Sequence, residues 1–161
     1  MLPFEAIRLA IVEGLQQETG RLVIQMNGGG PVPEGDFYTY HFPGGFRGSG
    51  GQPILLQQQA KLHRLEAVTF TFSFNSYADD TDVALIHAMQ ARDWFHTTGA
   101  ERLKWALDVV VVDVGDIQNR DVNLGEEWER RQGFDVEFRA TDVVITDLSG
   151  WIETAPIQRS E

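Results

Sequence analysis

The 161-residue chain contains no cysteine. Disulfides, thiolate zinc sites, iron–sulfur clusters and cysteine nucleophiles are therefore excluded, and any chemistry must use other side chains. Long hydrophobic runs are also missing, because Glu5, Arg8 and Glu13 interrupt the first apolar stretch. We therefore expect neither a membrane span nor a signal peptide, and no contact with a membrane.

Basic residues are scarce. The chain has 13 lysines and arginines against 24 aspartates and glutamates, which gives a formal net charge of -11. Residues 111–161 account for most of this excess, with twelve acids and five bases. Proteins that grip nucleic-acid phosphates normally present a basic surface. Direct binding to nucleic acid is therefore disfavoured.

The composition is that of one folded domain. Hydrophobic residues make up 42% of the chain, and at this length folding buries roughly two-thirds of the unfolded surface. We expect a single domain over residues 1–161. It should carry a mobile glycine-rich loop at 43–53, which has five glycines in eleven residues, and a polar C-terminal tail from about Asp147.

Hydrophobic periodicity predicts a leading helix and a central strand. Apolar residues at helical spacing favour a helix from Pro3 to Glu18 that stops at Gly20. Short strands are predicted at 22–26 and 37–42. Strict alternation of Phe70, Phe72 and Phe74 with polar residues predicts a half-buried strand over 68–75. The preceding segment 57–65 is either an edge strand or a lead-in.

The second half of the chain alternates helices and strands. A helix capped by Asp79 or Asp80 should run to about 98, followed by a short helix at 100–107. In the first of these helices, Ala84, Ala88, Ala91 and Phe95 form a stripe of mostly small side chains. Ile86 and Met89 project from a different side of that helix and so suggest a second partner. A valine run at 109–114 is typical of a strand covered on both faces, and 134–141 alternates like a half-buried strand. The fold class is α+β, with helices on one face of a largely antiparallel or mixed sheet.

No motif indicates catalysis, a cofactor or a metal. The acids at 79–82 could bind a hard cation, but helix capping explains them without one. The glycine loop at 27–35 lacks the lysine and following helix of a phosphate-binding loop. The four histidines show no zinc spacing, and we expect surface or strand-edge positions for them. The chain is therefore predicted not to be an enzyme.

One segment rich in charge and aromatics has two interpretations. Residues 115–121 and 126–131 are either a solvated connection or a protein contact. Trp128 beside Arg130 and Arg131 has the composition of residues that dominate interface energy. The strip is therefore a candidate contact surface.

The stretch from Thr69 to Val143 resembles the neck or tail-terminator proteins of tailed bacteriophages. The pieces that carry the resemblance are a strand ending in Ser-Tyr before acidic residues, a helix ending in Asp-Trp-Phe, a valine-rich strand leading to Asp116–Asp121, and Glu-Arg-Arg before Gly133–Val136. The two arginine-containing pieces together are fairly specific. The N-terminal half fits more loosely.

The resemblance implies a non-enzymatic virion protein, assembled in the host bacterial cytoplasm, that closes the tail tube and joins it to the head. Such proteins form rings, usually hexamers, around a channel for DNA. The implied partners are other copies of the chain, the tail tube protein, a connector or head-completion protein, and a sheath or collar protein. No cofactor is implied.

A ring subunit needs two unlike contact patches. Our candidates are Ile86 with Met89, and Trp128 with Arg130 and Arg131. An acidic channel would repel DNA weakly and let it pass, and Asp116 and Asp121 are the candidate channel-lining acids.

A different class of function stays open from the residues alone. A small ligand-binding or catalytic cone-type domain would use an aromatic-lined pocket formed by Phe70, Phe72, Phe74, Phe134 and Phe138. The same alternation is equally typical of an ordinary core. A nucleic-acid-binding module is opposed by the charge balance.

Overall fold

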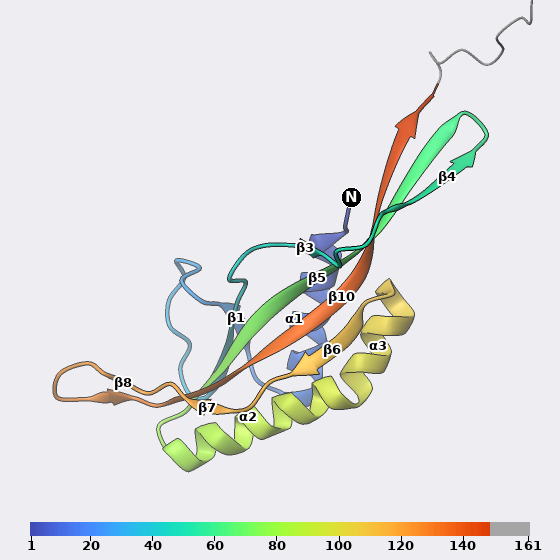
Figure 1. The fold of residues 1–161 in the computed structure, drawn as a ribbon. Coiled ribbons are helices and arrows are strands. Elements are labelled where there is room, and N and C mark those ends of the chain that lie inside the picture. Colours follow the sequence, from blue (N-terminus) through green and yellow to red (C-terminus); the bar gives the residue numbers. More distant parts are fainter. Residues whose placement is uncertain (149–161) are drawn as a thin grey trace, which may run out of the picture.

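Two long antiparallel strands run through the centre of the molecule (Figure 1). β5 (Lys61–Tyr77) and β10 (Arg131–Asp147) each have 17 residues and pair along their whole length. The strands predicted at 68–75 and 134–141 are therefore confirmed, and both extend well beyond the alternating segment. This computed structural model describes residues 1–148, so the expected polar tail lies almost wholly outside the described residues.

The other strands join this central pair. The sheet has the order β1-β2-β5-β10-β6, in which only β1 and β2 pair in parallel among the described strands, and β3, β4 and β7 attach to β5 or β10. Two further strands form a separate hairpin. The bounds are β1 (Val23–Gln25), β2 (Phe37–His41), β3 (Arg47–Gly48), β4 (Ile54–Gln58), β6 (Val110–Val114), β7 (Gln118–Asn119), β8 (Val122–Asn123) and β9 (Trp128–Glu129).

The three helices pack on one face of the sheet. They are α1 (Phe4–Thr19), α2 (Thr81–His96) and α3 (Thr98–Leu107). Phe4 of α1 stacks on Phe72 with ring centroids 5.9 Å apart, and Phe95 of α2 lies 4.9 Å from Phe74. Because Phe72 and Phe74 are two residues apart in β5, they point to the same face. The predicted α+β class with helices on one face is confirmed.

Local signals explain where the helices begin and end. Gly20 ends α1 in the left-handed conformation, with φ at 68°. Asp80 caps α2, because its carboxylate accepts hydrogen bonds from the backbone N–H groups of Asp82 and Val83. The stripe of Ala84, Ala88, Ala91 and Phe95 is fully buried, so α2 approaches the sheet closely, as predicted.

Phenylalanine rings fill the space between sheet and helices. Each ring of the central cluster contacts several others at centroid separations between 4.9 and 6.3 Å. Burying such a side chain contributes about 2–3 kcal/mol. The fully or almost fully buried members are Phe70, Phe72, Phe74, Phe95, Phe134 and Phe138. These rings form a packed core.

Two local expectations were wrong. The valine run does form a strand, β6, but that strand lies at the sheet edge, and Val112 and Asp113 are exposed instead of covered on both sides. His87 is buried on α2, against the expectation of a surface position, because it lies beside Ala84, Ala88 and Ala91 on the helix face that meets the sheet.

The glycine-rich segment makes more contacts than its composition indicates. Arg47 and Gly48 pair with Thr69 and Val68 of β5. The Phe46 ring lies 5.5 Å from that of Phe70 and 5.7 Å from that of Phe4. The segment is mostly exposed, and its mobility stays a prediction.

Candidate assembly surfaces

The two arginine-containing pieces of sequence, at 119–121 and 129–131, meet in space around one carboxylate. Asp121 accepts a hydrogen bond from the backbone N–H of Arg131 at 2.7 Å and one from the guanidinium of Arg130 at 3.3 Å. The amide of Asn119 donates a third hydrogen bond to it, at 3.3 Å. The chain from Asp121 to Arg131 is thereby closed into a loop that is fixed to the start of β10.

The electrostatics of Asp121 follow from these contacts. Burial of the carboxyl opposes its ionisation, but the hydrogen bonds from Arg131, Arg130 and Asn119 outweigh burial and lower the pKa of Asp121. The ionised carboxylate is therefore the form that holds the loop closed.

Arg120 anchors the same loop to the helix-free face of the sheet. Its guanidinium donates to the hydroxyl of Ser73 at 2.7 Å and to the side-chain oxygen of Asn75 at 3.1 Å. It also pairs with Asp135 of β10 at 3.1 Å. Burial tends to raise the pKa of Asp135, but the hydrogen bonds from Ser73 and Arg120 lower it on balance. On the face of the sheet without helices, Arg120 therefore links polar side chains of β5 and β10 to the loop.

Beyond this network, Val122–Glu129 project as a hairpin that we call the finger (Figure 1). Trp128 is 53% exposed, and the Arg130 guanidinium lies 5.4 Å from the centre of its ring. Leu124 is also exposed. Of the predicted contact strip, Trp128 is therefore available to a partner, while Arg130 and Arg131 are largely engaged within the chain.

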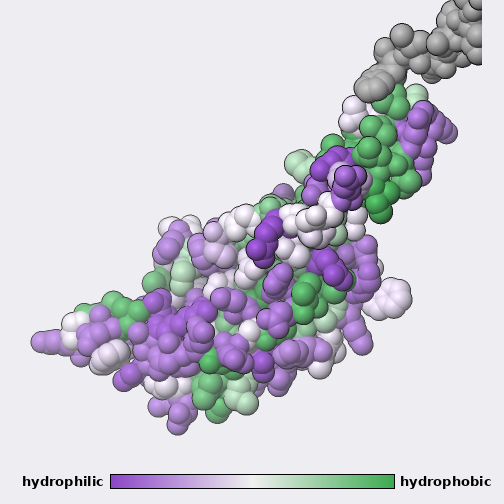
Figure 2. Space-filling model, viewed as in Figure 1, coloured by the Kyte–Doolittle hydropathy of each residue, from purple (hydrophilic) through white to green (hydrophobic). Residues whose placement is uncertain are grey.

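The outer face of α2 carries the second predicted patch. Ile86 and Met89 are 52% and 51% exposed, and Val83 and Leu85 beside them are partly exposed. Figure 2 shows hydrophobic side chains gathered over α2 at the lower edge of the view. This helix thus buries one apolar face against the sheet and leaves a second one uncovered.

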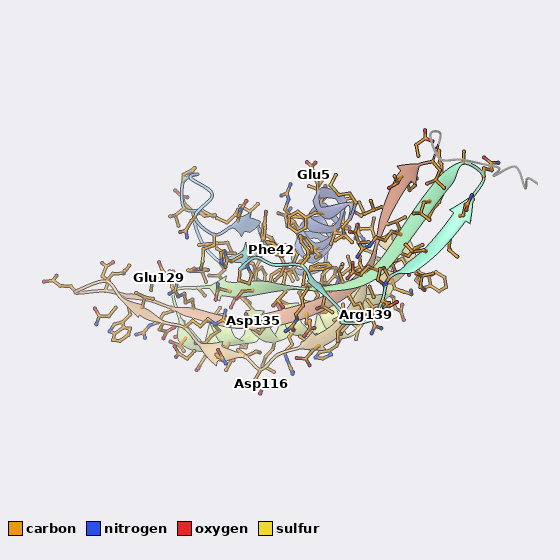
Figure 3. All side chains as sticks on the ribbon, turned by 45° about the horizontal axis from the view of Figure 1, so that its top comes forward. Glu5, Phe42, Asp116, Glu129, Asp135 and Arg139 are labelled. Atoms are coloured by element: carbon orange, nitrogen blue, oxygen red, sulfur yellow. The ribbon has the colours of Figure 1, made fainter. Side chains whose placement is uncertain are left out.

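The two candidate channel-lining acids, Asp116 and Asp121, differ sharply in how exposed their side chains are. The side chain of Asp116 is 99% exposed and points away from the sheet at the turn before β7 (Figure 3). The side chain of Asp121 is only 6% exposed and is held by its arginine partners. A channel-lining role stays a prediction for both acids, and the hydrogen bonds of Asp121 also close a loop.

A projecting three-stranded arm was missed by the sequence analysis. We define the arm as Ile54–Gln58 of β4, Lys61–Leu65 of β5 and Val143–Asp147 of β10, which pair as one small sheet. It extends past the helices at the upper right of Figures 1 and 2, with hydrophobic side chains on its surface. The sequence features that could have indicated the arm are the apolar runs Ile54-Leu55-Leu56 and Val143-Val144-Ile145, which lie beyond the three helices described in residues 1–148.

A family model described as phage neck terminator protein matches residues 9–161. No curated protein matches the sequence significantly. The family match covers nearly the whole chain, including the finger, α2 and the arm. The chain belongs to the phage neck terminator family.

As a neck terminator, the chain is a structural component of the phage neck and tail. The resemblance inferred from the residues is thereby confirmed. Within residues 1–148, no helix of the terminator is long and apolar enough to cross a bilayer. No group of three or more metal-ligating side chains lies together in that same part of the chain.

A groove of the terminator lies away from the five phenylalanines of the cone-type alternative, although Phe37 lines it. The groove measures about 1030 Å³ and lies between α1, β1 and the loop Met26–Val32, reaching Tyr77 and Arg131. The aromatic residues of the cone-type alternative are instead packed against one another and against the helices. The pocket that this alternative requires therefore does not lie beneath the phenylalanines.

Proposed function

We propose that this terminator forms a ring that closes the phage tail tube, joins it to the head and leaves a channel for DNA. The observation that carries the proposal is the outer face of α2, where Ile86 and Met89 remain exposed although the core is already closed. Such an uncovered apolar surface in a soluble fold marks an interaction site. Because the chain belongs to the neck terminator family, we expect other virion proteins to bind this face of α2.

The chain offers unlike surfaces, which a ring requires. A head-to-tail contact joins two different patches on neighbouring copies. Repeating this contact closes a ring when the rotation between copies is a whole fraction of a full turn. The α2 face is aliphatic and helical, whereas the finger presents Trp128. A hexamer is the expected number of copies. The tail tube protein and a connector or head-completion protein are the expected neighbours along the axis, with a sheath or collar protein as a further one.

Charge supports a passive channel. The net charge of -11 disfavours retention of DNA phosphates, and exposed acids such as Asp116 on an inner surface would keep DNA from adhering during transit. In this proposal the protein catalyses no reaction, needs no cofactor and assembles in the host cytoplasm.

The test of the proposed ring measures the mass and the shape of the particles that the purified protein forms. We expect purified protein to be monomeric or weakly associated in light scattering, and to form rings at high concentration or on purified tail tubes in negative-stain images. Changing Ile86→Asp together with Met89→Asp should abolish assembly without altering the circular dichroism spectrum, because both side chains are half exposed.

The matched control is Leu9→Asp with Trp105→Asp, which also places two acids at exposed apolar positions, but on α1 and α3. Normal assembly of the α2 variant would show that this face is not the contact. A chain that stays monomeric at every concentration, and does not bind tail tubes, would contradict the ring itself.

A further inference from the structure

The arm exposes hydrophobic side chains that the described part of its own chain, residues 1–148, leaves uncovered. Ile54 and Leu55 are 60% and 59% exposed, and Ile145 is 54% exposed. A three-stranded sheet with uncovered apolar faces is unfavourable in water and prone to associate. The arm is therefore a surface built for burial against another molecule.

The register shows which of its two faces is the more apolar. Leu56, His63 and Ile145 lie opposite one another, as do Ile54, Leu65 and Val143 two residues along the strands. Because side chains alternate between faces, these two rows share one face. We call it the open face, since it continues the helix-free side of β5. The other face mixes apolar with polar side chains, namely Leu55, Leu62 and Val144 with Gln57, Arg64 and Thr146.

The outer face of α2 matches the arm in length and in its apolar centre. Counting along the helix, Asp82, Ile86, Met89 and Asp93 fall on one stripe, so an apolar centre is flanked by two acids. That stripe is about 16 Å long, and the five residues of β4 span about 14 Å. At the arm tip, Lys61 lies in register with Gln58 and Asp147, so the apolar part of the open face also ends in charged groups.

The arm cannot reach α2 of its own chain. Tyr77, at the far end of β5, leads into α2, while Lys61 at the arm tip is 16 residues back along the extended strand. Figure 1 shows the arm and the start of α2 at opposite ends of the sheet. The contact must therefore join two molecules.

We propose that the open face of the arm docks on the outer face of α2 of a second copy of this chain. The two surfaces are unlike, so each copy would give its arm to one neighbour and receive the arm of another. In this arrangement the α2 face and the arm, and no longer the finger, are the two patches that join neighbouring copies in the ring. The finger is then available for contacts with proteins outside the ring. The inference rests on the proposed ring.

The absence of cysteine makes a clean cross-linking test possible. One protein carries Leu56→Cys and another carries Met89→Cys, and the two are mixed under oxidising conditions at a concentration that gives rings. We expect a disulfide-linked heterodimer from the mixture, no dimer from either protein alone, and a ladder of linked copies when one chain carries both changes. The matched control is Leu55→Cys with Met89→Cys.

Leu55 is next to Leu56 and more exposed, but it points to the other face of the arm. If the disulfide formed by random collision, Leu55→Cys would therefore cross-link to Met89→Cys at least as well as Leu56→Cys does. Docking through the open face should instead give a disulfide yield for Leu56→Cys that is higher by tenfold or more. Equal yields for the two positions would overturn the proposal, as would a Leu56 homodimer.

A second measurement separates this inference from the proposed function. Leu56→Asp with Ile145→Asp should weaken self-association at least tenfold while preserving the fold. If this variant forms normal rings, or forms rings but no longer binds tail tubes, the arm does not contact a second copy and the proposed ring stands. If the unchanged protein forms no ring at all, both are overturned.

Discussion

Removing the carboxylate of Asp121 should destabilise the protein, which would not follow if that acid faced a channel. The carboxylate holds the backbone N–H of Arg131 at 2.7 Å and the Arg130 guanidinium at 3.3 Å. A hydrogen bond to a charged group contributes about 1.5–3 kcal/mol, and the partly exposed Arg130 pair adds less than about 1 kcal/mol. Asp121→Ala should therefore cost about 2–3 kcal/mol of unfolding free energy.

Asp121→Asn provides the matched comparison. The amide oxygen can still accept from Arg131, so the loss should be only about 1 kcal/mol. Because the folded protein lowers the pKa of Asp121, its ionised form stabilises the fold above about pH 4, the ordinary range of an aspartate. That stabilisation is lost as pH falls through the lowered value. The difference between wild type and Asp121→Asn should therefore shrink in acid.

The assay is urea unfolding followed by tryptophan fluorescence at pH 7 and in steps down to pH 2.5. The slope with urea should be the same for all three proteins, so that midpoints report stability. An Asp121→Ala protein within about 0.5 kcal/mol of wild type, or an Asp121→Asn difference that does not vary with pH, would refute the role assigned to this carboxylate.

Three further outcomes are expected from urea unfolding. Gly14→Ala should destabilise by about 1–2 kcal/mol although alanine favours helices, because the new Cβ would lie 2.5 Å from the Trp94 ring; Glu13→Ala is the control. Asp80→Ala should cost about 1 kcal/mol through loss of the α2 cap, and Asp80→Asn much less. Burial raises the pKa of Tyr38 to about 12, so stability should fall as pH rises above about 10, and Tyr38→Phe should flatten that fall; an unchanged slope would contradict it.

Sequence reasoning succeeded where the determining signal is local. The alternation around Phe72 and the acidic cap of α2 at Asp80 each involve residues a few positions apart, and both appear in the structure as predicted. The exposed face at Ile86 and Met89 was also deducible, because helical spacing alone separates it from the buried alanine stripe.

The remaining features depend on partners far along the chain. The arm forms because Val143–Asp147 reach back to Lys61–Leu65, a pairing that no local pattern specifies. The edge position of β6 likewise depends on strand order. The loop-closing contacts of Asp121 could not be predicted, because its arginine partners come nine and ten residues later and are recognisable only once the loop is closed.

The uninterrupted ladder between β5 and β10 has a mechanical consequence. Seventeen paired residues span about 55 Å as one continuous antiparallel ladder. The arm is one end of that ladder, and the finger emerges from the other end. A load placed on the arm would therefore travel along the backbone hydrogen bonds of the ladder as far as Arg131, the residue at which the chain of the finger joins β10.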